Sequence, residues 1–210
     1  MHKDFSKIAK DPRKVVILMI ASALLGAMWF ILFRAITIDA NGPHYHANFH
    51  LYINGERELF EEGIYYEEVS SCGGSENDPK ARVHLHDFIG DVVHVHDASS
   101  TWGNFFEVLG FVLGNNVLYV DGKAYLDTSD SKLSFVLNGE VSQSVASKTI
   151  KSEDVLLISY GNESNTELIE RYDGITQNAA EYNAVADPSA CQGSQNVGLW
   201  DRIKLVVGID

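Results

Sequence analysis

Apolar and polar residues alternate along residues 44–53 (HYHANFHLYI), as they do in a β-strand with one face in the core. The apolar positions are Tyr45, Ala47, Phe49, Leu51 and Ile53, and the alternate positions are His44, His46, Asn48, His50 and Tyr52. Asn54-Gly55 follows, and this pair favours a two-residue type I′ turn because both residues tolerate positive φ. The pattern predicts a strand, a tight turn and a returning strand.

The pentapeptide Val83-His84-Leu85-His86-Asp87 returns ten residues later as Val93-His94-Val95-His96-Asp97. Both copies alternate, and Ile89-Gly90-Asp91 lies between them, so we predict a second hairpin. A simple register places His86 opposite His94 and His84 opposite His96, with Cβ atoms about 4.5–5.5 Å apart. A bulge at Gly90 would shift this register.

Hairpins dominate the rest of the chain. Asp121-Gly122 and Asn138-Gly139 are turn pairs within alternating segments, and residues 154–161 (DVLLISYG) predict a largely apolar strand. Helices are predicted after an N-cap at Ser99-Ser100, after the capping box Ser164-x-x-Glu167, and as one or two turns in AAEYNAVA. The last segment, LWDRIKLVVGI, is predicted to be a strand. Together these elements predict an α+β domain with a mostly antiparallel, hairpin-rich sheet and two or three short helices.

An apolar run over residues 15–33 (VVILMIASALLGAMWFILF) precedes this domain and ends at Arg34. As a helix it nearly covers a hydrocarbon core of about 30 Å, so we predict a transmembrane helix over residues 15–37. Residues 1–14 are a basic tail that should stay cytoplasmic, which places residues 38–210 outside the cytoplasmic membrane. A cleaved signal peptide is the rival interpretation, but its apolar core is shorter, about 7–15 residues, and small residues follow it.

The charges also differ between the N-terminal tail and the domain that follows the apolar run. The net charge is −13, and residues 38–210 hold 10 Lys and Arg against 27 Asp and Glu. Such a domain should repel nucleic acid, whose binding depends on cationic groups that neutralise phosphates. The acidic residues serve solubility, or they attract cations or a basic partner. Because they are scattered rather than clustered, the first interpretation is favoured.

The chain has two cysteines, Cys72 in SSCGGS and Cys191 in SACQGS. Outside the cytoplasm an isolated pair is most simply one disulfide, here between the middle of the domain and its C-terminal region. Thiolate ligation of a metal is the alternative, but neither cysteine has a second Cys or a His at ligand spacing.

Seven of the eight histidines lie within 53 residues, all at even positions, and six of them form HxH pairs. Imidazole is the commonest metal ligand of proteins, and an HxH pair on a strand directs both rings to one face. We therefore predict a metal site drawn from His44, His46, His50, His84, His86, His94 and His96. The alternatives are polar residues on a solvated face, a pH-responsive surface, and a hydrogen-bonded histidine network.

The ligand types narrow the choice of metal. All three methionines lie in the tail or the apolar helix, so methionine-rich Cu(I) sites and blue-copper sites are not supported. An imidazole-rich site suits copper, with zinc as the alternative. Asp87 and Asp97 have odd parity, and we expect them to end strands or to accept hydrogen bonds from imidazole N–H groups rather than to bind the ion.

The ordered segments HYHANFHLYINGE, VHLHDFIGDVVHVHD, TWGNFFEVLG and DVLLISYGNES resemble a family of uncharacterised, single-pass, extracytoplasmic proteins of archaea and several bacterial groups. The resemblance covers about residues 44–170. By this resemblance the motif positions are His44, His46, His84, His86 and His94, while His96 stands where the family more often has Glu. The resemblance implies the anchored architecture and hints at copper, without an established activity.

These features predict a membrane-anchored, extracytoplasmic metal-binding protein, with copper the favoured ion, that delivers metal or serves as a metal-bearing accessory. The other candidate is a structural or accessory subunit of a larger membrane protein complex, in which the histidines hold no metal. Catalysis would need a concave site and a positioned acid or base, for which Glu107 is the nearest candidate. An enzyme is therefore the least supported of the three interpretations.

Overall fold

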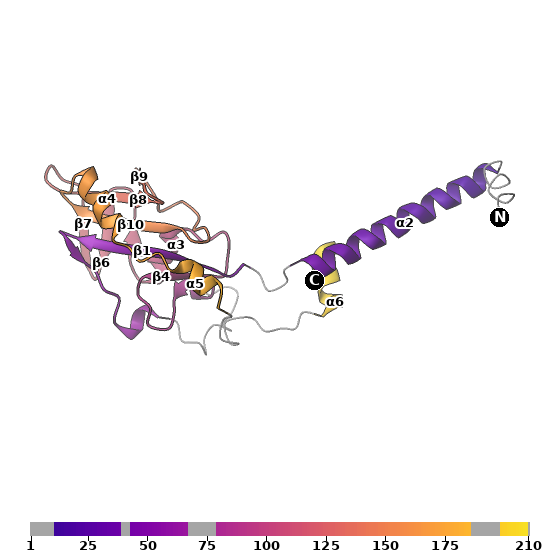
Figure 1. Ribbon diagram of the computed structural model, residues 1–210, viewed down its shortest axis with the longest axis horizontal. Coiled ribbons are helices and arrows are strands. Elements are labelled where there is room, and N and C mark those ends of the chain that lie inside the picture. Colours follow the sequence, from indigo (N-terminus) through magenta and orange to yellow (C-terminus); the bar gives the residue numbers. More distant parts are fainter. Residues whose placement is uncertain (1–10, 39–42, 67–78, 186–197, 210) are drawn as a thin grey trace. The chain divides into compact units, whose positions relative to one another are not determined.

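The structure, a computed structural model, describes residues 11–38, 43–66, 79–185 and 198–209 (Figure 1). The chain divides into two compact units, the first formed by Met1–Ala40 with Gln195–Asp210 and the second by Asn41–Ser194. The second unit has mixed, mostly antiparallel sheets with short helices. The predicted α+β fold class is therefore confirmed.

One long apolar helix, α2 (Pro12–Thr37), forms most of the described part of the first unit. The Asp11 carboxylate accepts a hydrogen bond from the backbone N–H of Arg13 at 3.1 Å, and Pro12 occupies the first helical position, where a missing N–H costs nothing. These residues start the helix three positions before the apolar run. Within the described residues, α2 is the only helix long and apolar enough to cross a membrane, a property that signal sequences near an N-terminus share.

The other helix of this unit corrects a prediction. The segment predicted as a final strand forms a helix, α6 (Leu199–Val207), which packs against α2. Its apolar residues Leu199, Ile203 and Val206 recur at helical spacing, and this period predicts the secondary structure better than apolar content alone. Gly208 ends the helix in the left-handed conformation, at φ 68°.

A seven-stranded sheet lies at the centre of the second unit, with strand order β3-β4-β1-β10-β8-β9 and β2 paired to β1. Its strands are β1 (Tyr45–Ile53), β2 (Glu56–Arg57), β3 (Val83–Leu85), β4 (Val92–Val95), β8 (Lys132–Leu137), β9 (Glu140–Ser142) and β10 (Val155–Gly161). Among the strands that the structure describes, only β1 and β10 run parallel, side by side (Figure 1). The predicted turns Asn54-Gly55 and Asn138-Gly139 join β1 to β2 and β8 to β9, with positive φ at all four residues.

One face of this sheet carries the main apolar core. The odd-numbered residues of β1, β3 and β4 lie on this face, together with Leu156 and Ile158 of β10. Helix α3 (Trp102–Val108) and a second, three-stranded sheet contribute to the same core. The strands of the second sheet are β5 (Val112–Leu113), β6 (Val117–Val120) and β7 (Lys123–Leu126). The predicted turn Asp121-Gly122 joins the last two of them.

Capping boxes start the two longer helices of this unit. Ser164 caps α4 (Asn165–Asp173), as predicted, by accepting from the backbone N–H three residues later. The cap of α3 is Thr101 rather than the predicted Ser99-Ser100. Ser99 instead donates its backbone N–H and its hydroxyl to Asp97 in the preceding turn, and so it is not free to cap the helix.

Two helices, α4 and α5 (Ala179–Asn183), pack on the second face of the large sheet. Over β8 and β10 lies α4, whose Leu168 and Tyr172 pack on an apolar patch that includes Val136, Val155 and Leu157. Helix α5 lies against β1. The remaining part, formed by β3, β4 and the start of β1, carries the histidines.

Candidate metal centre

Three adjacent strands bring the histidines into one row. Strand β4 pairs with β3 on one side and with β1 on the other, and His94 lies opposite His84 in the first pair and opposite His46 in the second. The predicted register, with His86 opposite His94 and His84 opposite His96, is therefore wrong by two residues. A shift of two preserves the alternation of side chains, so the imidazoles stay on one face.

The connection between β3 and β4 explains the shift. Asp87 and Phe88 follow His86 directly, and both adopt left-handed backbone conformations, with φ of 53° and 58°. They turn the chain before the predicted bend, and the backbone N–H of Ile89 donates to the His86 carbonyl at 3.0 Å. Strand β3 consequently ends at Leu85, and His84 rather than His86 is paired with β4.

We refer to six of the histidines as the histidine cluster: His44, His46, His84, His86, His94 and His96. Relative exposure is 1% for His84, 2% for His94, and 6% for His46 and His86, while His44 and His96 are half-buried. The cluster is therefore not a set of polar residues on a solvated strand face. Burial of polar groups costs free energy unless specific interactions compensate, so the cluster calls for a specific partner.

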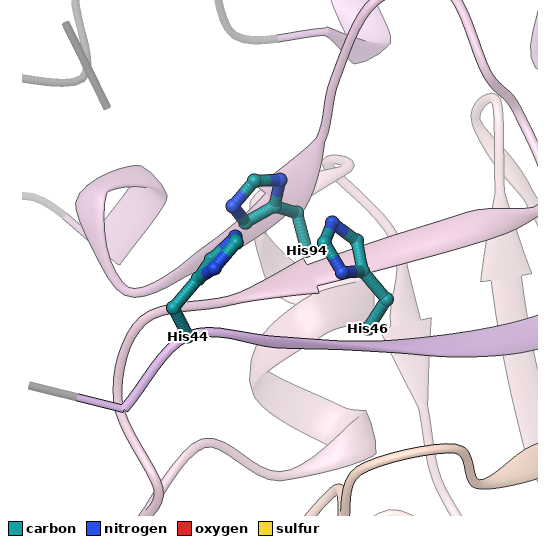
Figure 2. A group of neighbouring side chains, drawn as sticks. All are labelled: His44, His46 and His94. Atoms are coloured by element: carbon teal, nitrogen blue, oxygen red, sulfur yellow. The ribbon is translucent and has the colours of Figure 1, made fainter. Parts of the chain in front are cut away.

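Two groups of three imidazoles within the cluster could hold a metal ion, and His94 belongs to both. One group is His44, His46 and His94, and the other is His84, His94 and His96. Figure 2 shows the first group, with His44 and His46 directed from the β1 segment toward His94 on the neighbouring strand. In each group the donor nitrogens lie within 4.8 Å of one another, and an ion at about 2.0–2.1 Å from each nitrogen would draw the rings closer.

The other rings gather around that of His94. Its ring centroid lies 4.5 Å from those of His46 and His96, 4.6 Å from that of His44, 5.1 Å from that of His84 and 5.4 Å from that of His86. The central strand β4 therefore supplies the central imidazole.

Oxygen acceptors fix three of the rings through Nδ1. The distances are 3.0 Å from His46 Nδ1 to Asn183 Oδ1, 2.6 Å from His84 Nδ1 to the Lys80 carbonyl oxygen, and 2.9 Å from His86 Nδ1 to the Asp87 carboxylate. An oxygen acceptor favours a proton on Nδ1, and the neutral ring then carries its lone pair on Nε2. Hydrogen bonds of this kind orient metal-binding histidines and select their tautomer.

Asn183 is a supporting residue that the sequence pattern does not reveal. Its Oδ1 also accepts the backbone N–H of His46 at 2.8 Å, which fixes the orientation of the amide, and its Nδ2 donates to Ser152 Oγ at 3.0 Å. Asn183 lies at the end of α5, 137 residues after His46. The local sequence predicts a helical turn there, but nothing in it indicates which strand that turn approaches.

His84 is the most deeply buried ring of the cluster. Burial, and then the neighbouring His94, lower the pKa of His84 from 6.5 to about 3, against a smaller opposing effect of the Lys80 carbonyl. The ring is therefore neutral at physiological pH, which is the form that binds metal ions. Its Nε2 has no hydrogen-bond partner among the described residues, as expected of a ligand atom held ready for an ion.

His50 lies apart from the cluster. It projects from the same face of β1 but belongs to neither group of three, although it was predicted among the metal ligands. Its Nε2 is 3.7 Å from Oδ2 of Asp91, and Arg57 Nη2 lies 3.1 Å from the same oxygen. The structure thus assembles six of the seven predicted histidines and leaves His50 beside an ion pair.

The two aspartates of the repeated pentapeptide take supporting positions. Asp87 contacts the ring of His86, as described above. Asp97 lies two residues after β4, where hydrogen bonds from Ser99 and then the guanidinium of Arg82 hold the pKa of Asp97 below its ordinary value. Neither carboxylate belongs to a group of three donors.

The remaining candidate residues of the sequence are Glu107 and the two cysteines. Glu107 is exposed on α3, which packs on the opposite face of the sheet, so it cannot serve the histidine cluster as an acid or base. Cys72 and Cys191 lie outside the described residues, and their disulfide stays a prediction.

The cluster is an all-imidazole donor set in a buried setting, and such donors suit copper and zinc ions. Comparison of the chain with family models, curated proteins and solved structures finds no match. The function is therefore argued from the chemistry of the site rather than from a relative.

Proposed function

We propose that this chain is a membrane-anchored, extracytoplasmic protein that binds a copper ion in its histidine cluster and delivers it to, or holds it for, a membrane partner. The observation that carries the proposal is the pair of buried imidazole groups that share His94. The hydrogen bond at Nδ1 of His84 supports it, because it leaves Nε2 of that buried ring for a metal ion.

Copper is the favoured ion and zinc the alternative. At a given nitrogen-donor site Cu²⁺ binds more tightly than Zn²⁺. Neither group of three contains a carboxylate, which would favour Mg²⁺ or Ca²⁺, or a sulfur ligand, which would favour Cu(I).

The proposed membrane anchoring depends on α2. The cationic tail before this helix favours a cytoplasmic N-terminus, which places the sheet domain outside the cytoplasmic membrane. His44 follows Ile38, the residue that caps α2, by only six positions, so a short linker tethers the site to the anchor. A metal site tethered in this way suits exchange with a membrane-embedded partner. The resemblance to single-pass, extracytoplasmic proteins supports the same placement.

Metal analysis of the full chain in mild detergent tests this function. After loading with Cu²⁺ or Zn²⁺ and removal of excess ion, the wild type should retain about one ion per chain, with copper displacing zinc. The combined variant His84→Ala, His86→Ala, His94→Ala, His96→Ala should retain none, whereas the control His50→Ala should match the wild type. Absence of bound metal in the wild type, or equal metal in the combined variant, would refute the proposal. Circular dichroism establishes that each variant is folded.

One observation favours the second candidate function, an accessory subunit of a membrane complex. Phe88 exposes 73% of its surface although its backbone is left-handed, and it lines a hollow of about 300 Å³ with Leu59, Phe60 and Tyr66. Strained bulky residues and exposed apolar side chains are both typical of contact sites. Extraction in mild detergent should then recover a stoichiometric partner protein with the wild type and lose it with Phe88→Ala. Recovery of the chain alone would count against this candidate.

A further inference from the structure

We propose that the histidine cluster holds one ion at a time, in either of two neighbouring positions that share His94 as a ligand. The first position is formed by His44, His46 and His94, and the second by His84, His94 and His96. This inference rests on the proposed metal-binding function and adds how many ions bind and how an ion moves. An ion that changes position crosses β4, from the side of β1 to the side of β3.

The chemistry of the shared ring excludes simultaneous occupation. A neutral imidazole has one protonated nitrogen and one nitrogen with a free lone pair, so it can bind one ion. Two ions would both bind His94 only if the ring lost its second proton as well. Each group without His94 would have two imidazoles, fewer than the three protein ligands of a typical catalytic or transfer site.

The surrounding charges also oppose a second ion. The nearest carboxylates of the repeated pentapeptide are already engaged, Asp87 with the ring of His86 and Asp97 with Arg82. Neither carboxylate is a member of the two groups, so two divalent ions would share a buried, neutral donor set. Charges of the same sign at the spacing of neighbouring strands, about 4.8 Å, repel strongly where water is excluded.

The two positions are alike enough to exchange an ion. Each combines His94 with one nearly inaccessible ring, His46 or His84, and one half-buried ring, His44 or His96. His46 and His84 flank His94 in the same row of the sheet and are each held through Nδ1 by an oxygen. An ion bound through His94 can therefore exchange the remaining two ligands without leaving the cluster.

Binding constants of four variants test this sharing. Two alternative positions add their association constants, so loss of one of two equal positions weakens binding only about two-fold. His46→Ala disables the first position and His84→Ala the second, and each should bind Zn²⁺ about two-fold more weakly than the wild type, as measured by competition with a chelator. His94→Ala and the double variant His46→Ala, His84→Ala should both lose more than the roughly 10–100-fold typical of removing an outer hydrogen bond.

Cu²⁺ spectra give a second measurement that does not depend on affinity. The electron paramagnetic resonance spectrum of the wild type should be the sum of two spectra, one obtained from His46→Ala and the other from His84→Ala. His50→Ala is the control, because it removes a buried histidine of the same face that belongs to neither position. Its spectrum and its affinity for Zn²⁺ should match those of the wild type.

The outcomes separate this inference from the proposed function. Two ions per wild-type chain, or a loss in His46→Ala or His84→Ala alone that equals the loss in His94→Ala, would overturn the shared site while metal binding stands. Absence of any bound ion would overturn both. If His94→Ala does not fold, His94→Gln provides the same comparison, since its amide is a poor substitute for an imidazole ligand.

Discussion

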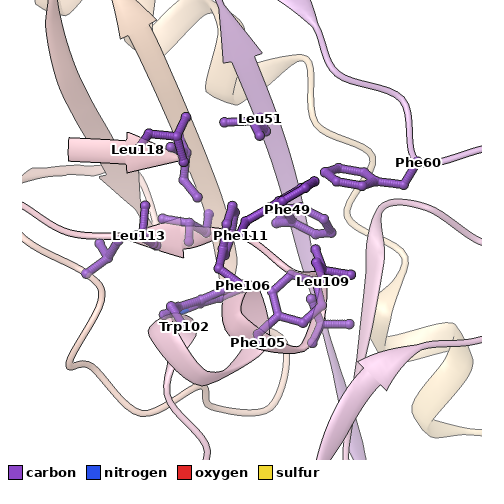
Figure 3. Packing of buried hydrophobic residues seen from close by; sticks show 14 of the residues in the cluster. Phe49, Leu51, Phe60, Trp102, Phe105, Phe106, Leu109, Phe111, Leu113 and Leu118 are labelled. Atoms are coloured by element: carbon purple, nitrogen blue, oxygen red, sulfur yellow. The ribbon is translucent and has the colours of Figure 1, made fainter. Parts of the chain in front are cut away.

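The two faces of β1 differ in chemistry, yet both are buried. On one face Phe49 belongs to the main apolar core and packs edge to face on Phe105, with ring centroids 4.9 Å apart (Figure 3). On the other face His46, three residues earlier, is 6% exposed and bonds to Asn183. The alternation of the strand therefore does not separate a dry face from a wet one. It separates two kinds of interior.

The two faces are stabilised by different interactions. The apolar face is stabilised by removal from water alone, at roughly 25 cal/mol per Å² of buried apolar surface. The imidazoles lose their hydration and regain stability only through specific partners. Asn183 and the Lys80 carbonyl supply partners at Nδ1 of His46 and His84, and we propose that a metal ion is a further partner of the imidazoles.

The largest expected effect is a loss of stability when a residue of the apolar core is truncated, with metal binding on the opposite face unchanged. Phe105→Ala should lower the free energy of unfolding by about 3–5 kcal/mol, because it leaves a cavity among tightly packed rings. The protein that remains folded should bind as much metal as the wild type, since α3 lies across the sheet from the histidines. Urea unfolding and metal analysis measure the two quantities. Val112→Ala truncates a largely exposed residue of β5 and is the control, with little change expected in stability or in metal content. A loss of metal in folded Phe105→Ala would show that the two faces are coupled.

The next effect is stabilisation of the histidine face by its ligand. At a Zn²⁺ concentration of about 100 times Kd, the free energy of unfolding should rise by about 2.7 kcal/mol, because the ion binds the folded chain. A chelator should reverse the rise. His94→Ala should show no rise, since it removes the ligand common to both groups. An equal rise in His94→Ala would place the stabilising ion elsewhere.

Much of this comparison could be predicted from the alternation of residue types. The even positions of the histidines place them on one face whatever the register, so a register error of two residues leaves that prediction intact. The turn pairs Asn54-Gly55 and Asn138-Gly139 fix local hairpins through their own backbone preferences. These features depend on neighbouring residues, which a sequence displays directly.

Other features depend on residues distant in the chain. Whether the histidine face is wet or buried depends in part on α5, which arrives more than 130 residues after His46. The register of β3 and β4 depends on left-handed conformations at Asp87 and Phe88, and Phe is a residue for which that conformation is unusual. The error at α6 has a different origin: its helical period is visible in the sequence, but its apolar content favoured a strand.

A smaller effect concerns the pH dependence of the metal-free protein. Because the pKa of His84 is about 3 in the folded chain and 6.5 is its ordinary value, the unfolded chain binds a proton between these values that the folded chain does not. Stability should therefore fall as pH is lowered from about 6.5 toward 3, with a contribution from His84 of up to about 1.4 kcal/mol per pH unit. Urea unfolding between pH 7 and pH 4 measures this slope. His84→Leu should unfold with a shallower slope, and an unchanged slope would contradict a neutral, buried His84.

The smallest effect tests whether the partners of the histidine face act through the rings or only through packing. In the His84→Ala background, where only the position formed by His44, His46 and His94 remains, Asn183→Ala removes the acceptor at Nδ1 of His46 and should weaken Zn²⁺ binding about 10-fold, the lower end of the range for such supports. Asn178→Ala, made in the same background, is a matched control, because Asn178 accepts a hydrogen bond from the side chain of Asn48, a residue of the same strand that is not a histidine. Both substitutions remove side-chain amide contacts between β1 and the α5 segment, two with His46 for Asn183 and one with Asn48 for Asn178, so both should lower stability. Only Asn183→Ala should change the affinity for the ion, and equal affinities in the two variants would mean that α5 covers the histidines without orienting them.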